Sequence, residues 1–212
     1  MKAPVIVAID GPAGAGKSTV ARAVAVALGI PHLDTGAMYR ALAFKAIQND
    51  LTPADDVQIK DLLATTNITY AGGKVILDGE DVSLRIRMPD VSERASKIAT
   101  NASVRLWMVS RQRDWAGALG GVVEGRDIAT VVFPQTPFKF FLTATLDERA
   151  QRTGTDKGKI EERDLTDSER AASPLLVAKG ASVIDTTQMT IDEVVAKIVE
   201  SVRNVMQEQE RS

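Results

Sequence analysis

VIVAIDGPAGAGKSTVARAVAVALG, residues 5–29, passes from an apolar run through glycines into a helical pattern. Val5–Ile9 is rich in β-branched side chains, which is typical of a strand buried on both faces of a parallel sheet. Residues 17–28 place apolar side chains at helical spacing, and Gly29 follows as a helix stop. A simple turn needs one glycine, whereas this connection holds three. The stretch therefore predicts a strand, a glycine-rich loop and a helix in direct succession.

The loop has the spacing G-x-x-x-x-G-K-S from Gly11 to Ser18. Glycines let several backbone N–H groups converge on one point, because no Cβ blocks the approach. The helix start adds unpaired N–H groups and the positive end of the helix dipole. Lys17 can reach β- and γ-phosphate oxygens, and the Ser18 hydroxyl can ligate Mg²⁺. A plain glycine turn with a capping serine is the alternative, but the full motif between strand and helix predicts a nucleoside triphosphate site.

Composition and charge narrow the classes of protein to which the chain can belong. Of its 212 residues 44% are apolar, which is enough for a packed core, and the net charge is −2. A nearly neutral chain without a basic run argues against nucleic-acid and membrane partners. The absence of cysteine excludes a disulfide framework and a thiolate metal site, and it favours a cytoplasmic protein. The apolar start is broken by Asp10 and is too short for a signal peptide.

Strands that alternate with helices predict an α/β fold, a parallel sheet flanked by helices of the P-loop NTPase type. Short β-rich runs joined at Gly-Gly and Asp-Gly suggest hairpins, which are foreign to a strand–helix–strand repeat. We therefore expect a single kinase-sized domain, 1–212, with a core of about 1–65 and 101–212 and an inserted lobe of about 66–100 carrying a small antiparallel sheet. Helices are expected at 36–48, at 89–100, at 103–119 and at 191–206, with one more that ends near Ala64. Strands are expected at 67–70, 74–77, around Val82, and at 122–124, 139–142 and 182–184.

Six arginines lie in or beside polar motifs of the chain: Arg40, Arg126, Arg149, Arg152, Arg163 and Arg170. A single arginine is most often a solvated surface charge. Together they fit phosphoryl transfer between two nucleotides, where catalysis is mostly positioning and electrostatic stabilisation. The acceptor phosphate is already ionised near neutral pH and needs no strong base, so the single histidine, His32, is expected to be structural. A guanine-reading N-K-x-D tetrad is absent, which argues against a switch GTPase.

Five segments together resemble the bacterial cytidylate kinases of the nucleoside monophosphate kinase group: IDGPAGAGKST, LDTGAMYR, Gly79–Arg87, VEGRDIATVVFP and RDLTDSERAASPL. The phosphate loop is shared by many families, whereas the other segments are much more specific. The resemblance covers nearly the whole chain and implies a P-loop core, an acceptor-binding lobe with a small sheet, and a lid that closes over the phosphates. Closure of such a lid excludes water, which would compete as phosphoryl acceptor.

The resemblance also assigns the residues of the site that handle phosphate. It places the ATP phosphates on Gly11, Pro12, Ala13, Gly14, Ala15, Gly16, Lys17, Ser18 and Thr19. It gives Mg²⁺ to Ser18 and implies catalytic roles at the transferring group for Lys17, Arg126, Arg149, Arg152 and Arg163. The family usually continues E-R-A-x-R-R into a longer helical lid, whereas Thr153 follows Arg152 here, so the lid, about 149–170, is expected to be short.

For the acceptor, CMP or dCMP, the resemblance implies three groups of contacts. Thr35, Tyr39 and Arg40 line its sugar and phosphate side, Arg126 and Arg170 hold its phosphate, and Arg163 and Asp167 approach its ribose. Ser96, Arg105 and Asp127 read the cytosine, whose amino group needs an acceptor and whose N3 and O2 need a donor. The expected protein is a monomeric ATP-dependent kinase of CMP and dCMP. Two other interpretations stay open, a related kinase for UMP or another small phosphorylated acceptor, and a P-loop ATPase or switch protein.

Overall fold

The computed structural model describes residues 4–52, 55–71, 73–170 and 173–211, in two compact units. The first unit is Met1–Leu33 with Arg113–Ser212, and the second is Asp34–Gln112. The first contains β1 (Ile6–Asp10), α1 (Lys17–Leu28), β2 (His32–Asp34, whose last residue opens the second unit), β6 (Gly121–Gly125), the π-helix η2 (Ile128–Val132), β7 (Phe138–Thr143), α6 (Leu146–Thr153), α7 (Lys157–Ser168), β8 (Ser182–Asp185) and α8 (Ile191–Arg211).

The first unit is built on a sheet with the strand order β2-β6-β1-β7-β8. β1 pairs in parallel with β6 on one side and with β7 on the other, and β7 pairs in parallel with β8. In this register Asp10, the last residue of β1, lies opposite Gly125 of β6. The chain order reverses at β1, and ligands of open α/β sheets bind at such a reversal, beyond the carboxyl ends of the strands. The predicted α/β fold of the P-loop type is confirmed, and the glycine loop follows β1 at this position.

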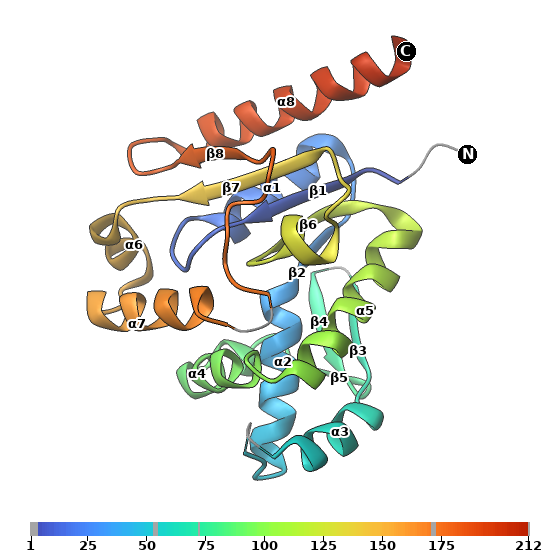
Figure 1. Cartoon of the computed structure of the whole chain (residues 1–212), viewed down its shortest axis with the longest axis vertical. Coiled ribbons are helices and arrows are strands. Elements are labelled where there is room, and N and C mark those ends of the chain that lie inside the picture. Colours follow the sequence, from blue (N-terminus) through green and yellow to red (C-terminus); the bar gives the residue numbers. More distant parts are fainter. Residues whose placement is uncertain (1–3, 53–54, 72, 171–172, 212) are drawn as a thin grey trace. The chain divides into compact units, whose positions relative to one another are not determined.

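Two helices cover one face of this sheet, α1 and α8 (Figure 1). α8 is amphipathic, and its side chains Val194, Ile198 and Val202 recur every four residues on one buried stripe. They pack with Val20 and Val24 of α1 and with the apolar side chains of β1, β6 and β7 in one core cluster. Burial of this stripe holds α1, and with it the end of the glycine loop, rigidly on the sheet.

The second unit combines helices with a small antiparallel sheet in the order β3-β4-β5. Its elements are α2 (Thr35–Gln48), α3 (Asp56–Ala64), β3 (Ile68–Ala71), β4 (Lys74–Leu77), β5 (Glu80–Asp81), the 3₁₀ helix η1 (Arg85–Arg87), α4 (Pro89–Ile98) and most of α5 (Ala102–Leu119). The unit is wider than the lobe expected at 66–100, because α2 packs against α4, η1 and β4. That this unit binds the acceptor stays a prediction.

Most expected elements appear within a few residues of their expected bounds, and the differences are local. The last small strand is Glu80–Asp81 and lies just before Val82. α8 continues to Arg211, beyond the expected end at Met206. β2, η1 and η2 were not expected, and neither were α6 and α7, which occupy most of the segment expected as a short lid. Gly72 of the expected hairpin turn, and Ala171 and Ala172 of the last quoted segment, lie outside the described residues.

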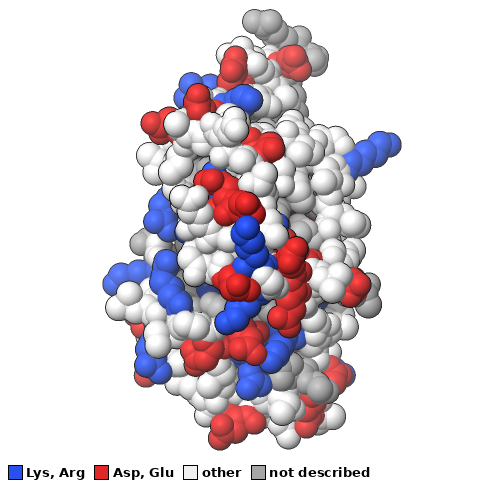
Figure 2. Space-filling model, turned by 90° about the vertical axis from the view of Figure 1, so that its left-hand side faces the viewer, with Lys and Arg blue, Asp and Glu red and all other residues white. Residues whose placement is uncertain are grey.

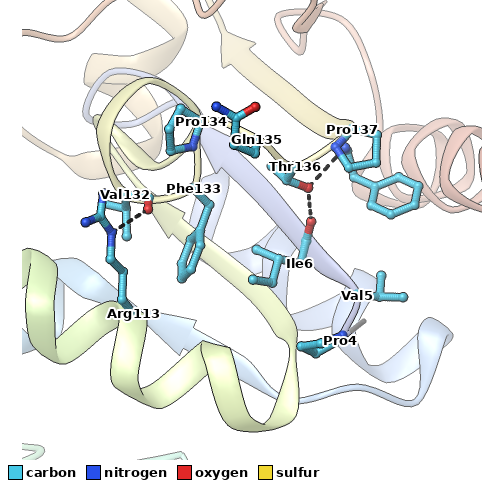
Figure 3. Close-up of a pocket in the computed structure, with 11 residues that line it drawn as sticks. Pro4, Val5, Ile6, Arg113, Val132, Phe133, Pro134, Gln135, Thr136 and Pro137 are labelled. Carbon is cyan, nitrogen blue, oxygen red and sulfur yellow. Dashed lines mark hydrogen bonds between the residues drawn. The ribbon is translucent and has the colours of Figure 1, made fainter. Parts of the chain in front are cut away.

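Two surface features complete the description. Acidic and basic side chains are interspersed on the face drawn in Figure 2. A pocket of about 540 Å³ opens at the amino end of β1, the end away from the glycine loop. It is lined by Pro4–Ile6, Arg113 and residues 132–138 (Figure 3).

Within the described ranges, no helix has the length and apolar character that crossing a bilayer requires.

Candidate active site

The glycine loop between β1 and α1 has a backbone that only glycine can supply at two of its positions. Gly11 has φ +147°, and a Cβ there would lie 2.1 Å from the backbone oxygen of Leu142 in β7. Gly14 has φ +78°, and a Cβ there would lie 2.8 Å from the Cβ of Arg149 in α6. The loop is therefore packed against β7 on one side and against α6 on the other, and it keeps its N–H groups available on the remaining side.

Lys17 is the first residue of α1 and is buried, with only 7% of its surface exposed. Its Nζ donates a hydrogen bond of 2.6 Å to the carbonyl oxygen of Pro12, so the side chain folds back over the loop. Burial lowers the pKa of Lys17 well below its usual value, and the nearby charge of Arg126 lowers it further. A phosphate bound in the loop would attract the ammonium group and favour its charged form, which opposes the effects of burial and of Arg126 on this pKa.

Ser18, the expected metal ligand, lies beside a carboxylate that the sequence analysis did not select. Its Oγ donates to Glu124 Oε2 at 2.8 Å, while His32 Nε2 lies 3.0 Å from Glu124 Oε1. Glu124 is in β6 and is 3% exposed. His32, expected to be structural, thus orients a carboxylate of the site. The signal for Glu124 was its place at the end of a core strand within the quoted segment VEGRDIATVVFP.

These groups fit Mg²⁺, because one hydroxyl and one carboxylate leave most coordination positions to phosphate and water, as this ion prefers. Among the described residues no group of three or more His, Cys, Asp or Glu side chains could hold a metal ion by itself. A metal at Ser18 and Glu124 would therefore be shared with bound phosphates.

Asp167 of α7 lies between two of the arginines that were expected to bind the acceptor. Arg126 Nε donates to Asp167 Oδ2 at 2.7 Å, and Arg170 donates to Asp167 Oδ1. Burial alone would raise the pKa of Asp167, but the charges of Arg126 and Arg170 hold it below its usual value. The charge of Arg163 acts on both Asp167 and Lys17. The structure thus brings Lys17 and three of the expected arginines into one electrostatic cluster with the buried carboxylates Asp167 and Glu124.

The two arginines of α6 are anchored at the glycine loop. Arg149 Nη1 donates to Asp164 Oδ2 at 2.5 Å and to the carbonyl oxygen of Ala13 at 3.3 Å. Arg152 donates to Thr186 at both its Oγ1, at 2.9 Å, and its carbonyl oxygen, at 2.8 Å. The Thr186 hydroxyl in turn lies 3.3 Å from the carbonyl oxygen of Ala15. Both guanidinium groups therefore tie α6 to the loop, and their expected contact with the transferring phosphate stays a prediction.

Asp127 follows Arg126 and is the residue before η2. It is 5% exposed, and its backbone oxygen accepts from the N–H groups of Val131, at 2.9 Å, and Val132, at 3.2 Å. The wide helical turn after β6 therefore begins on Asp127 and fixes its backbone. π-Helical turns are rare and often occur at functional sites.

The second unit holds the other expected acceptor residues. The Arg105 guanidinium lies 5.7 Å from the centre of the Tyr39 ring, which permits a cation–π contact, and Nη1 of Arg105 donates to the carbonyl oxygen of Ala99 at 3.4 Å. Arg105 is only 3% exposed. Two residues that the resemblance assigns to base and sugar are thus in contact, on α5 and α2.

Three further expected residues of this unit have local partners. Thr35 is buried at the first position of α2. Arg40 Nη2 donates to Asp34 Oδ2 at 2.9 Å, and Asp34 also caps α2 by accepting from the N–H of Ala37. Ser96 Oγ donates to the backbone oxygen of Ser92 at 3.4 Å, a weak bond that a ligand could replace. The acceptor roles of these residues stay predictions.

The family model described as cytidylate kinase matches residues 7–204. The chain belongs to the cytidylate kinase family. A cytidylate kinase from Caldanaerobacter subterraneus subsp. tengcongensis is 44% identical, over 93% of this chain and 94% of that protein. A cytidylate kinase from Desulforamulus reducens is 47% identical, over 91% and 94%.

A solved structure, of an uncharacterized protein from Eubacterium ventriosum, shares 14% identity with a TM-score of 0.51 and covers 94% of this chain and 98% of its own. At that identity the likeness concerns the fold alone. In this cytidylate kinase family member the glycine loop and Arg126 follow the carboxyl ends of the neighbouring strands β1 and β6, and Lys17, Glu124, Arg163 and Arg170 lie in the same unit.

Proposed function

We infer that the protein transfers the γ-phosphoryl group of ATP to the phosphate of CMP or dCMP, giving ADP and CDP or dCDP. Membership of the cytidylate kinase family over residues 7–204 carries this conclusion. The geometry of the first unit supports it, because Lys17 of the phosphate loop lies close enough to Arg126 and Arg163 for their charges to lower its pKa. In the transfer an oxygen of the acceptor phosphate forms a bond to the γ-phosphorus of ATP. The bond between the γ-phosphorus and the β,γ-bridging oxygen breaks, and ADP leaves with that oxygen.

On the donor side, we propose that the N–H groups of residues 11–19 and the ammonium group of Lys17 hold the β- and γ-phosphates. Mg²⁺, when bound, would neutralise β- and γ-phosphate charge. Ser18 and Glu124 are the side chains proposed to hold it. His32 would keep the Glu124 carboxylate turned toward Ser18, as the hydrogen bonds on its two oxygens support.

On the acceptor side, we propose that Arg126 and Arg170 bind the phosphate of CMP and that Arg163 assists at the transferring group. Asp167 offsets part of the charge of these guanidinium groups in the absence of ligand, which supports a role in keeping them close together by lowering their repulsion. Arg149 and Arg152 are also proposed to act at the transferring group, and their hydrogen bonds, which hold α6 at the loop, support this place for them. The ribose contacts of Arg163 and Asp167 remain part of the same proposal.

The experiment that tests the function is a coupled assay of ADP release with CMP, dCMP, UMP and no acceptor. We expect turnover with CMP and dCMP, much less with UMP, and almost none with water alone. Chelating Mg²⁺ with EDTA should abolish turnover, because the β- and γ-phosphate charge is then no longer neutralised. Preference for UMP would identify a related kinase, and turnover without any acceptor would identify an ATPase.

Base discrimination gives a sharper prediction. We propose that Arg105 donates to N3 and O2 of cytosine, that Asp127 accepts from its amino group, and that Ser96 assists. UMP presents the opposite polarity at N3 and O4. A hydrogen bond to a charged group is worth about 1.5–3 kcal/mol, so Arg105→Ala or Asp127→Ala should narrow the ratio of kcat/KM for CMP over UMP by roughly tenfold or more.

Arg40→Ala is the matched control for these two variants. Its proposed place is with Thr35 and Tyr39 on the sugar and phosphate side, which CMP and UMP share, so it should weaken both acceptors alike. Steady-state kcat/KM for both acceptors in the four proteins decides the matter. Equal losses of CMP and UMP activity in Arg105→Ala and Asp127→Ala would remove the support for a base-reading role.

A monomeric state, a cytoplasmic location and the lack of nucleic-acid or membrane partners stay predictions from the sequence. The interspersed charges on the face drawn in Figure 2 and the net charge of −2 support only the lack of nucleic-acid and membrane partners, since a polyanion-binding surface usually gathers basic side chains. Sedimentation of the purified protein at micromolar concentration checks the monomeric state.

A further inference from the structure

Asp10 is a buried carboxylate that no role has yet been given to. It is the last residue of β1, directly before Gly11, and it is 1% exposed. Its Oδ1 accepts from the backbone N–H of Ile128 at 2.9 Å, and its Oδ2 accepts from that of Ala129 at 2.7 Å. Both oxygens of one carboxylate are therefore used to hold the first two residues of η2.

The helix η2 needs such support because its own hydrogen bonds leave its ends open. The backbone N–H of Phe133 reaches back to the oxygen of Ile128 at 2.7 Å, the five-residue spacing of a π-helix. The first N–H groups of any helix lack partners within it, and the last carbonyl groups do too. Arg113 serves the far end: its Nε donates to the carbonyl oxygen of Val132 (Figure 3), and its Nη2 donates to that of Val131. The Asp10 carboxylate thus binds the N-terminal end of η2 and the Arg113 guanidinium group binds its C-terminal end. A negative charge is favoured at the first end and a positive charge at the second.

Only two residues separate the end of β6 from the start of η2, and these are Arg126 and Asp127. Gly125 is fixed by its pairing opposite Asp10, and Ile128 is fixed by the Asp10 side chain. The backbone of Arg126 and Asp127 is therefore held from both sides through a single residue. Any shift of η2 would move the Arg126 guanidinium away from Asp167 and would turn the Asp127 side chain.

We propose that Asp10 is a positioning residue for the acceptor, which places Arg126 and Asp127 so that the phosphate and the base of CMP are bound together. The proposal rests on the proposed function, because it takes CMP as the acceptor. It links the strand that carries the donor loop directly to the turn that carries the acceptor residues.

The electrostatics of Asp10 fit a role beyond simple packing. The pKa of Asp10 is raised to about 6, and burial is the main cause. The negative charge of Asp127 also raises this pKa. The hydrogen bonds from Ala129 and Ile128 and the positive charge of Lys17 lower it, but by less. A charged carboxylate at this position is costly at neutral pH. Only the ionised form offers both oxygens purely as acceptors to two backbone N–H groups.

The decisive variant is Asp10→Asn, which keeps the size but turns one acceptor into an NH₂ group facing a backbone N–H. We expect kcat/KM for CMP to fall about tenfold, the factor for losing one such bond, while KM for ATP stays within about twofold. The CMP over UMP ratio should narrow as Asp127 turns. Thr136→Val is the control, because Thr136 Oγ1 bonds to Ile6 at the other end of β1, beside the pocket of Figure 3, and this variant should keep wild-type constants.

Two further measurements separate positioning from a purely structural role. KM for CMP in the wild type should rise as pH falls from 7.5 to 5 more than in Asp10→Asn, a comparison that cancels the ionisation of the CMP phosphate itself. Amide exchange without nucleotide should be faster at Ile128 and Ala129 in Asp10→Asn and unchanged in Thr136→Val. Equal effects on ATP, CMP and UMP, identical pH profiles, or unaltered exchange at both amides would overturn the proposal.

The outcomes for Asp10 and for the proposed function are distinguishable. If the wild type did not phosphorylate CMP, the proposed function would fail and the acceptor role of Asp10 with it. The exchange experiment would still decide whether Asp10 holds the turn, since it uses no substrate.

Discussion

Replacing Lys17 with methionine is expected to lower kcat by about a hundred- to a thousandfold without lowering the melting temperature. Removing one preorganised donor from the developing charge of a transition state typically has this effect. Methionine keeps most of the length of the side chain. It also removes an ammonium group whose pKa burial, with help from Arg126, already lowers, so the folded state loses an unfavourable buried charge. Activity and stability should therefore move apart.

The matched control is Lys60→Met, at an exposed lysine of α3 whose Nζ pairs with Asp56 at 2.7 Å. That variant should keep its kcat, because a surface ion pair contributes little and lies in no proposed site. Initial rates at saturating ATP and CMP, together with thermal unfolding, are measured for all three proteins. Turnover near the wild-type rate in a folded Lys17→Met protein would exclude Lys17 from the chemistry.

Asp167→Asn is expected to reduce the free energy of unfolding by about 3–5 kcal/mol at pH 7.5, because it leaves buried guanidinium groups without their counter-charge. Asp167 is 1% exposed and accepts from both Arg126 and Arg170. These arginines hold the pKa of Asp167 in the folded protein below its value of about 3.8 in the unfolded chain. The contribution of ionised Asp167 to the free energy of unfolding is therefore fully present at pH values above 3.8. It is lost only as pH falls through the lower folded pKa.

Urea unfolding of the wild type and Asp167→Asn between pH 7.5 and pH 3.5 tests this. The difference between them should be constant down to about pH 5 and shrink below about pH 4, following the titration of the unfolded chain and then of the folded one. Asp147→Asn is the control, since Asp147 is 78% exposed in its pair with Lys157 and should change stability little. A stability of Asp167→Asn equal to that of the wild type at pH 7.5 would mean that the arginines do not depend on this carboxylate.

The parts of the fold that the sequence predicted are those that local patterns determine. Each of these patterns lies within one element or one hairpin. They are the β-branched run of β1, the apolar spacing of α1, and the strand pattern with turn residues of β3 and β4. β2 has three residues, too few for a period to be visible, and η2 has a spacing that no common pattern resembles. Both were missed for this reason.

The candidate site divides in the same way. The loop of residues 11–19 is a contiguous motif and could be read directly, whereas Glu124 joins Ser18 across 106 positions of the chain. Asp10 joins Ile128 across 118 positions, and only the pairing of β1 with β6 makes them neighbours. A lone carboxylate after an apolar run carries no sign of its partner. The arginines stood out in the sequence and the resemblance named Asp167 as a ribose contact, but the hydrogen bonds that join Asp167 to Arg126 and Arg170 became visible only in the structure.

The pairing of Asp10 with Gly125 fixes the distance between the starts of the two phosphate-binding segments. Neighbouring strands of a sheet lie about 4.8 Å apart, a spacing set by backbone hydrogen bonds and independent of the side chains. The glycine loop starts from one of these two strands and the turn with Arg126 starts from the other. Their separation is thus the same whatever sequence the loops or the lid acquire. Insertions and losses in α6, α7 or the small sheet can therefore accumulate without changing the distance between the two phosphate-binding segments.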